Sequence, residues 1–254
     1  MGYVVPTGRR SGKKNMTKLA VGWPWSVPFV WTKFVDAAFN VRDPKDVEVK
    51  WIRGIGWSPA RRRIDLVEKA LAWGADLIMF FDADQIPEPD ILERLYARVL
   101  EGYLPISAMV PTRELVQRNV GAKLFQPLAW RWAPTKLDEN GRPILRQFRS
   151  QKEDPDMVEL VKQDGSMQQV HMIGAGCIMF HRDHILALKK PWFFETFNKE
   201  TYQREATMDT RFAWRLNIEA SAPLWCDTSI KIKHLHDMEI DSSFQYRFNE
   251  TAIR

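Results

Sequence analysis

Apolar and polar positions follow two different periods in the first hundred residues, which predicts alternating strands and helices. Residues 18–24 and 77–81 are short apolar runs typical of buried strands, and residues 46–53 alternate polar with apolar side chains. Residues 26–40 and 58–74 instead place apolar side chains near helical spacing. Strands that alternate with helices predict an α/β fold, a single Rossmann-like domain with a mostly parallel central sheet and helices on both faces.

The helix predicted over residues 58–74 also has start and stop signals. Ser58 is a good N-cap, Pro59 suits the first helical position, and Gly74 suits the residue after the last turn. A further helix is predicted to begin at Pro87, because apolar side chains recur at helical spacing after it.

The second half of the chain is less regular. Residues 111–170 contain five prolines and two turn-like segments, which predicts an irregular insertion with hairpins that covers a cleft. Residues 170–180 and 229–235 predict strands, and residues 205–217 predict a helix.

Composition is that of an ordinary globular protein. Of the 254 residues, 45% are hydrophobic and 27% charged, so the chain can bury a sizeable core. Two cysteines are too few for a disulfide framework or a cysteine zinc site. No apolar run approaches the roughly 20 residues of a membrane span, and the start lacks the apolar core of a signal peptide. We therefore expect a cytoplasmic location and no membrane span.

The net charge of +5 comes entirely from one end of the chain. Residues 1–18 contain five basic and no acidic side chains, so the rest of the sequence sums to zero. This predicts a basic flexible arm over residues 1–17, a domain over 18–240 and a tail over 241–254. A neutral body disfavours a nucleic-acid-binding module, which stays an alternative because of the arm.

The first candidate for chemistry is Asp82-Ala83-Asp84, which directly follows the strand over residues 77–81. In open α/β sheets, ligands bind outside the carboxyl ends of strands. Two carboxylates so close together repel each other unless a cation lies between them, and oxygen ligands favour Mg²⁺ or Mn²⁺. The alternative is a polar loop in which Asp84 caps the next helix.

Three other positions are candidates. His234 ends the last predicted strand and could be a further metal ligand, and His236 shares its strand face. Arg61, Arg62 and Arg63 lie in the first turns of their helix, where a bound anion would offset the helix dipole, and Arg61 is the preferred contact; a solvated face neutralised by Asp65 and Glu68 is the alternative. Asp209 starts a helix, either as a cap or as a general base that faces a cleft.

In this order, the pieces resemble the family-2-like GT-A glycosyltransferases. The helix over residues 58–73 followed by GADLIMFFDADQIPEPDIL resembles that family's helix, strand and DxD stretch. GAGCIMFHRDHI resembles its glycine-containing strand beneath the sugar site, MDTRFAWRLN its acidic segment, and CDTSIKIKHLH its closing strand with a terminal histidine. The resemblance covers residues 18–110 and 168–238 and implies the GT-A fold.

The resemblance also implies an activity, namely metal-dependent transfer of a sugar from a UDP- or GDP-sugar to a hydroxyl acceptor. The acceptor could be a glycan, a protein or a modified nucleic-acid base, chosen by residues 111–170. Asp209 would be the base of an inverting reaction. Asp82, Asp84 and His234 would hold Mn²⁺ or Mg²⁺. The residues implied to line the donor site are Pro24, Arg61, Asp82, Ala83, Gly174, Ala175 and Gly176.

Two positions depart from the family pattern, and two other functions stay open. Met208 stands where the family often has Glu, and Arg62 stands where Asn commonly follows the arginine. A metal-dependent phosphohydrolase or nucleotidyltransferase could also use a DxD after a strand. Haloacid-dehalogenase-like phosphatases, however, have Thr or Val where Ile86 stands. The second alternative is the non-enzymatic nucleic-acid-binding module.

Overall fold

The computed structural model describes eight stretches of the chain: residues 16–24, 31–111, 116–117, 123–124, 128–132, 158–197, 204–235 and 239–240. Almost all of the predicted basic arm, the predicted tail over residues 241–254, and His236 lie outside the described residues.

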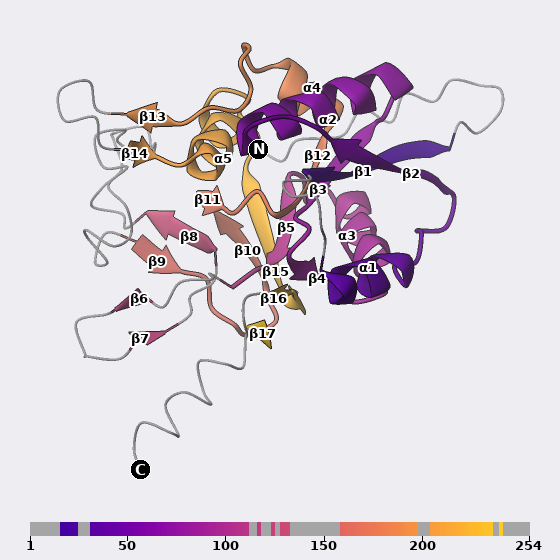
Figure 1. Ribbon diagram of the computed structural model, residues 1–254. Coiled ribbons are helices and arrows are strands. Elements are labelled where there is room, and N and C mark those ends of the chain that lie inside the picture. Colours follow the sequence, from indigo (N-terminus) through magenta and orange to yellow (C-terminus); the bar gives the residue numbers. More distant parts are fainter. Residues whose placement is uncertain are drawn as a thin grey trace.

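The core of the fold is a seven-stranded sheet with the order β10-β15-β5-β12-β3-β1-β2 (Figure 1). Neighbours β1–β2, β1–β3 and β5–β15 pair in parallel, whereas β12 is antiparallel to β3 and β5, and β10 is antiparallel to β15. Five of the seven strands thus run in one direction, and only β12 and β10 run in the other, so the predicted mostly parallel sheet is confirmed. The strands are β1 Thr17–Pro24, β2 Val47–Gly54, β3 Leu77–Phe81, β5 Ile106–Met109, β10 Met167–Val170, β12 Cys177–His181 and β15 Leu224–Lys231.

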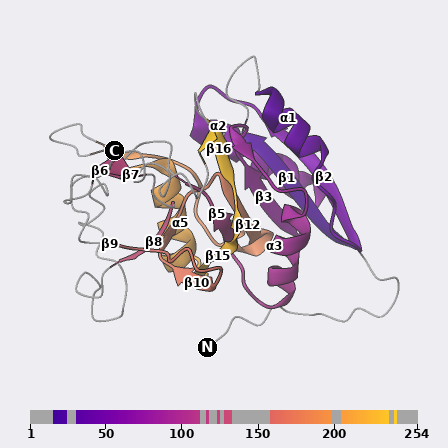
Figure 2. The same ribbon diagram turned by 90° about the horizontal axis from the view of Figure 1, so that it is seen from below.

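Helices cover both faces of this sheet, as predicted (Figures 1 and 2). Side chains alternate between the two faces of a strand, so β3 contributes Ile78 and Phe80 to one core and Met79 to the other. The first core is covered by α2, α4 and α5, and the second by α1 and α3. These helices are α1 Thr32–Phe39, α2 Pro59–Trp73, α3 Ile91–Leu100, α4 Arg182–Leu186 and α5 Met208–Ile218.

The signals at the ends of α2 act as the sequence predicts. The Ser58 hydroxyl accepts a hydrogen bond from the Arg61 amide at 3.1 Å, and Gly74 ends the helix with a left-handed φ of 79°. Two other helices differ from the prediction at their starts. Trp31 is extended and α1 begins at Thr32, while residues 26–30 of the predicted helix lie outside the described residues; α3 begins at Ile91 rather than at Pro87. The later start of α3 follows from a short strand, β4 Gln85–Ile86, that pairs with β16 Lys233–Leu235.

Two predicted strands are each divided in the structure. Residues 170–180 form the end of β10, then β11 Met172–Ile173 and β12, with a turn at residues 175–176. Residues 229–235 contain the end of β15 and all of β16. The residues at these breaks are buried, as are those in the strands on either side. The apolar pattern in the sequence therefore continues without interruption and does not reveal the breaks.

Short strands flank the main sheet. In the segment over residues 111–170, β6 Val116–Gln117 pairs with β7 Lys123–Leu124, and β8 Ala129–Trp132 pairs with β9 Val158–Leu160 and with β11. The same segment supplies β10 of the central sheet. Elsewhere, β13 Thr196–Phe197 pairs with β14 Arg204–Ala206, and β17 Glu239–Ile240 pairs with β16. No helix in the described stretches is long and apolar enough to cross a membrane.

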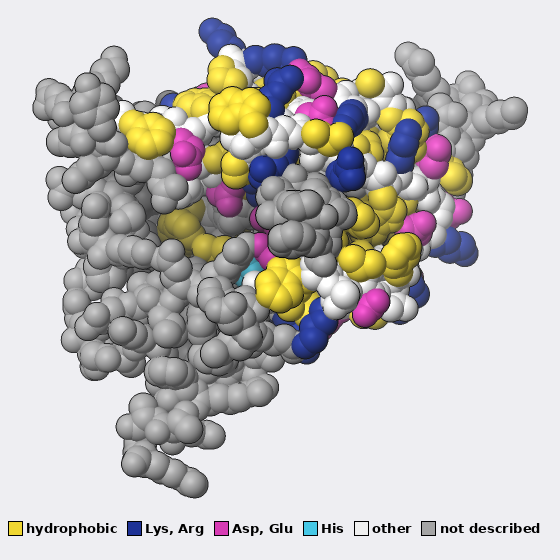
Figure 3. Space-filling model, in the orientation of Figure 1, with side chains coloured by type: hydrophobic (Ala, Val, Ile, Leu, Met, Phe, Trp, Pro, Cys, Tyr) yellow, Lys and Arg dark blue, Asp and Glu magenta, His cyan; other side chains and the backbone are white. Residues whose placement is uncertain are grey.

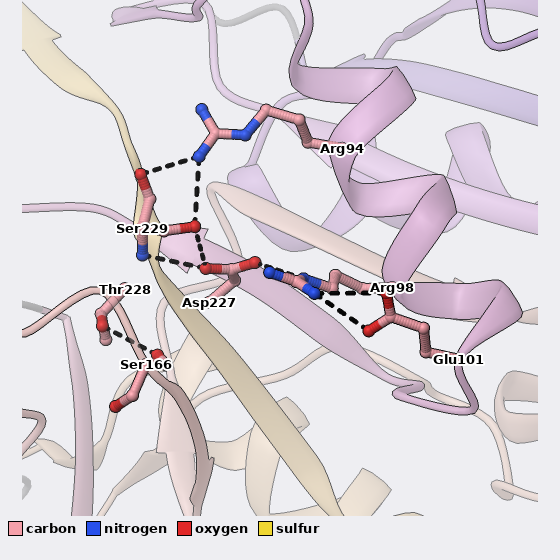
Figure 4. Close-up of polar contacts among 7 residues, drawn as sticks. All are labelled: Arg94, Arg98, Glu101, Ser166, Asp227, Thr228 and Ser229. Carbon is pink, nitrogen blue, oxygen red and sulfur yellow. Dashed lines mark hydrogen bonds and ion pairs between the residues drawn. The ribbon is translucent and has the colours of Figure 1, made fainter.

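A polar network ties α3 to β15 on one side of the sheet (Figure 4). Asp227 is 1% exposed; its Oδ2 accepts from Arg98 Nε at 2.8 Å, and its Oδ1 accepts from the Ser229 amide at 2.9 Å and the Ser229 hydroxyl at 2.5 Å. Arg94 donates to the Ser229 carbonyl at 2.9 Å. Both oxygens of the buried carboxylate therefore have donors, and the pairing of β15 with β5 shifts register just beyond Asp227.

Candidate functional site

The DxD segment is held at the carboxyl end of β3 by backbone hydrogen bonds on two sides. The Asp82 amide donates to the Gly176 carbonyl at 2.8 Å, and the Asp84 carbonyl accepts from the Leu235 amide at 2.6 Å. The antiparallel register of β4 and β16 places His234 opposite Gln85. Segments about 150 residues apart in sequence are thus brought together at one edge of the sheet. Figure 3 shows a histidine beside acidic side chains near the middle of one face.

His234 is buried, and its ring is oriented by a carbonyl. Its Nδ1 lies 2.9 Å from the Pro111 carbonyl oxygen, and its Nε2 lies 3.4 Å from Asp84 Oδ1. A carbonyl oxygen only accepts hydrogen bonds, so Nδ1 carries the hydrogen and, in the neutral ring, Nε2 carries the lone pair. A lone pair that faces a carboxylate oxygen at this distance is favourable only when the two atoms share a proton or a cation.

Asp82 and Asp209 meet at a third residue, Arg63. One terminal nitrogen of Arg63, Nη2, lies 2.9 Å from Asp82 Oδ1, 3.2 Å from Asp82 Oδ2 and 3.8 Å from Asp209 Oδ1. The Arg63 side chain is 4% exposed, whereas those of Asp82 and Asp209 are 26% and 35% exposed. Burial by itself would lower the pKa of Arg63, but the two carboxylates more than offset it and the pKa is raised. The guanidinium is therefore a permanent charge between two partly exposed carboxylates.

Several polar atoms at this edge have no hydrogen-bond partner within the described part of the chain. They are Arg63 Nε, Gln85 Oε1 and Asp209 Oδ1, all inaccessible to solvent. Buried polar atoms are normally paired, and exceptions concentrate where a ligand, ion or water belongs. This edge of the sheet is therefore polar and incompletely satisfied.

The glycine-containing turn lies directly against the carboxylates. A Cβ at Gly176 would overlap the Gln85 side-chain amide and lie 2.9 Å from Asp82 Oδ2. Ala175 is fully buried, and Gly174 packs on Leu128. Of the three predicted donor-site residues in this turn, the structure brings Gly176 to Asp82.

Pro24 and Arg61 lie farther out. Pro24 ends β1 opposite Gly54 at the end of β2, so it emerges at the same edge of the sheet as the DxD segment. Arg61 is exposed on α2, and the guanidinium that contacts the carboxylates belongs to Arg63 instead.

Sequence reasoning preferred Arg61 over Arg63 within the arginine run, and it missed Gln85. A signal for Arg63 was available, because it precedes the buried Leu66, Val67 and Ala70 of α2 by three, four and seven residues and so lies on their face of the helix. The three consecutive arginines were treated as one group, although consecutive helical residues point about 100° apart. Nothing in the sequence marked Gln85, since β4 is only two residues long.

The residues here fit a divalent metal in part. Asp84 and His234 offer one oxygen and one nitrogen at the same point, a donor set that Mn²⁺ accepts. Both oxygens of Asp82 face Arg63. Accordingly, no group of three or more His, Cys, Asp and Glu among the described residues could hold a metal ion alone. The predicted set of Asp82, Asp84 and His234 therefore forms no such group, and a metal here would need further ligands from substrate or water.

Comparison with known proteins gives information on the fold only. No protein-family model and no curated protein matches the sequence. Among solved structures, the chain is similar to A197 from STIV, with 16% identity, a TM-score of 0.50 and 87% of each chain covered. It also matches 4-diphosphocytidyl-2C-methyl-D-erythritolsynthase from Anaerococcus prevotii DSM 20548 at 9% identity and a TM-score of 0.39, over 94% and 97% of the chains. The likeness to A197 shows a shared fold alone, and the second is too weak to bear on function.

Proposed function

We propose that this protein is a metal-dependent glycosyltransferase that moves a sugar from a nucleotide-diphosphate sugar, UDP- or GDP-linked, to a hydroxyl acceptor. One observation carries the proposal. Asp82, Asp84, Asp209 and His234 were selected from three separate stretches of sequence, and they meet in two linked contacts at the carboxyl edge of the sheet. That edge is where α/β sheets bind ligands.

Asp84 and His234 are the residues that would hold the metal, and the donor diphosphate would complete its ligands. When bound, a divalent metal supplies Lewis acidity that neutralises charge on the leaving diphosphate. The Pro111 carbonyl orients the His234 ring by accepting from Nδ1, which leaves Nε2 directed at Asp84.

Asp209 is the proposed base. Its carboxylate is partly exposed at the start of α5, and its Oδ1 accepts no hydrogen bond from the described residues. In an inverting transfer, the acceptor oxygen forms a bond to the anomeric carbon while the bond from that carbon to the diphosphate breaks. Asp209 takes the hydroxyl proton, and the nucleoside diphosphate leaves.

Asp82 and Gly176 are proposed to contact the donor. Arg63 orients the Asp82 carboxylate, and the missing side chain at Gly176 leaves room beside it. A carboxylate in this position can accept hydrogen bonds from ribose hydroxyls. Acceptor choice is proposed to depend on residues 111–170, whose first residue, Pro111, contacts His234.

The test is a thermal-shift panel of UDP-, GDP- and TDP-sugars, each with Mn²⁺, Mg²⁺ or EDTA. A ligand that binds only the folded state raises the melting temperature by mass action. We expect a metal-dependent rise for one nucleotide and, for that donor, release of the nucleoside diphosphate on turnover. Release of pyrophosphate or of inorganic phosphate from simple esters would instead indicate a nucleotidyltransferase or a phosphohydrolase. No shift with any nucleotide would contradict the proposal.

A further inference from the structure

Arg63 is the most deeply buried charge at the candidate site, although the sequence favoured its neighbour Arg61. Its side chain is enclosed by Phe80, whose ring centre lies 5.8 Å from the guanidinium carbon, and by Met208, whose sulfur lies 3.8 Å from Nη1. The Nε hydrogen meets no acceptor within the described residues. Because the surroundings of the guanidinium are otherwise apolar, its charge is compensated by Asp82 and Asp209.

The three consecutive arginines of α2 have three different surroundings. Arg61 is exposed, Arg62 donates from Nε to the Gly56 carbonyl at 2.9 Å, and Arg63 points into the protein. The helix therefore delivers one cation to a point where the end of β3 and the start of α5 come together.

We infer that Arg63 is a positioning residue that holds Asp82 and Asp209 in place through a single nitrogen, Nη2. The inference rests on the proposed function, in which Asp82 contacts the donor and Asp209 acts as the base. Without the guanidinium, two carboxylates of like charge would share one partly enclosed space with no counter-charge between them. Both would then be free to turn away from the positions that donor and acceptor require.

The planar guanidinium fixes the direction in which Nη2 points, and this role depends on that direction. Nη2 contacts both oxygens of Asp82 while Nη1 lies against Met208, so the orientation of the group is fixed on two sides. A lysine ammonium is a compact charge on a flexible stem and has no such preferred plane. Arg63→Lys therefore restores the charge but not the alignment of the two carboxylates.

The experiment compares Arg63→Met, Arg63→Lys and a matched control, Arg98→Met, in the full chain with the donor found in the panel. Arg98 also pairs with an aspartate, Asp227 on β15, and its contacts within the described residues include no residue of the candidate site. For Arg63→Met we expect kcat to fall about 100-fold and the donor KM to rise about tenfold. Arg63→Lys should recover the donor KM more than kcat. Arg98→Met lowers stability by unpairing Asp227, but the kcat per folded molecule and the donor KM should stay within about twofold of wild type.

A kcat for Arg63→Met or Arg63→Lys that equals the Arg98→Met value would overturn the inference. If Arg63→Met does not fold, Arg63→Lys decides alone. The inference then requires a reduced kcat with a nearly normal donor KM, and wild-type values of both would contradict it.

A second measurement does not depend on turnover, so the two proposals can fail separately. In urea unfolding, Arg63→Lys and Asp209→Asn are combined in a double-mutant cycle. Residues in contact couple, so the unfolding constants should depart from additivity by about fivefold or more. Additivity within about twofold would overturn the positioning role. Coupling in a protein that binds no nucleotide would uphold the contact but contradict the proposed function and, with it, the catalytic meaning of Arg63.

Discussion

Two arginine–aspartate pairs in this protein have nearly equal bond lengths and opposite surroundings. Arg98 reaches Asp227 at 2.8 Å, and Arg63 reaches Asp82 at 2.9 Å. In the first pair the carboxylate is buried and the arginine is partly exposed, and both carboxylate oxygens have donors from Arg98 and Ser229 (Figure 4). In the second pair the arginine is buried, and the carboxylate is open to solvent on one side.

The difference separates a structural pair from a candidate site. Both carboxylate oxygens of Asp227 already accept hydrogen bonds from protein donors, so the role of this network is to join α3 to β15. At Arg63, a buried Nε has no acceptor in the described chain, and Asp209 Oδ1 and Gln85 Oε1 have no hydrogen-bond donor there. Buried polar atoms without hydrogen-bond partners lower stability. A protein keeps them where a bound ligand supplies the missing partners.

The largest expected effect is on turnover. Asp209→Asn should lower kcat by about 100-fold to 10,000-fold, because a general base is lost. The change keeps the shape of the side chain, so donor binding and the fold should be retained. Steady-state kinetics measure this, with Asp183→Asn as control, since Asp183 lies in the first turn of another helix, α4. Near wild-type kcat for Asp209→Asn would show that the base is wrongly assigned.

The next effect is on stability. Asp227→Ala removes a buried carboxylate and leaves the Ser229 amide and hydroxyl without their acceptor, which should lower the free energy of unfolding by about 2–3 kcal/mol. The folded fraction should still transfer sugar at the wild-type rate, because the network does not touch the candidate site. Urea unfolding and kinetics on the same preparation check both parts. If kcat falls by more than the folded fraction does, the Arg98–Asp227 pair is not purely structural, and the difference proposed between the two pairs is wrong.

A smaller effect is expected at the turn beside Asp82. Gly176→Ala places a methyl group against the Gln85 amide and Asp82 Oδ2, and overpacking of this kind costs about 1–3 kcal/mol. Because the neighbours that must move are site residues, donor affinity should fall together with stability. Calorimetric titration with the donor nucleotide measures the first and urea unfolding the second. Unchanged affinity in a stable variant would place the donor away from Gly176.

The smallest effect is a pH dependence of the Asp227 contribution. Burial raises the pKa of Asp227, but hydrogen bonds from Ser229 and Arg98 more than offset this, and the pKa is lowered. The folded state therefore binds fewer protons than the unfolded state, so the contribution is complete above the unfolded pKa of about 3.9 and is lost as pH falls through the folded pKa. The stability difference between wild type and Asp227→Asn should narrow below about pH 4. A difference that stays constant down to pH 2 would contradict the ion-pair account.

The sequence predicted the fold well where local signals are strong. Strand β3 and helix α2 lie where periodicity and the Ser58, Pro59 and Gly74 signals place them. The prediction failed where a strand depends on pairing with a distant segment of the chain. Strand β4 exists because β16 lies beside it, and this pairing moves the start of α3 to Ile91.

The sequence identified most residues of the candidate site, but it did not show which other groups hold them in place. Asp82, Asp84, Asp209 and His234 were selected from motifs, and two of the contacts they make depend on Arg63 and Pro111. A carbonyl such as that of Pro111 has no signature in a sequence, since every residue has one. Arg63 could have been identified by following the buried face of α2 back from Leu66.

The most direct test of the central claim is calorimetric titration of Mn²⁺ into the full chain, with and without saturating UDP or GDP, for wild type, Asp84→Ala and Asp227→Asn. With only two protein ligands in place, Mn²⁺ should bind weakly alone and much more tightly with the matching nucleotide. Asp84→Ala should lose this gain, and Asp227→Asn should keep it. Equal Mn²⁺ affinity with and without either nucleotide, or a full gain in Asp84→Ala, would contradict the account.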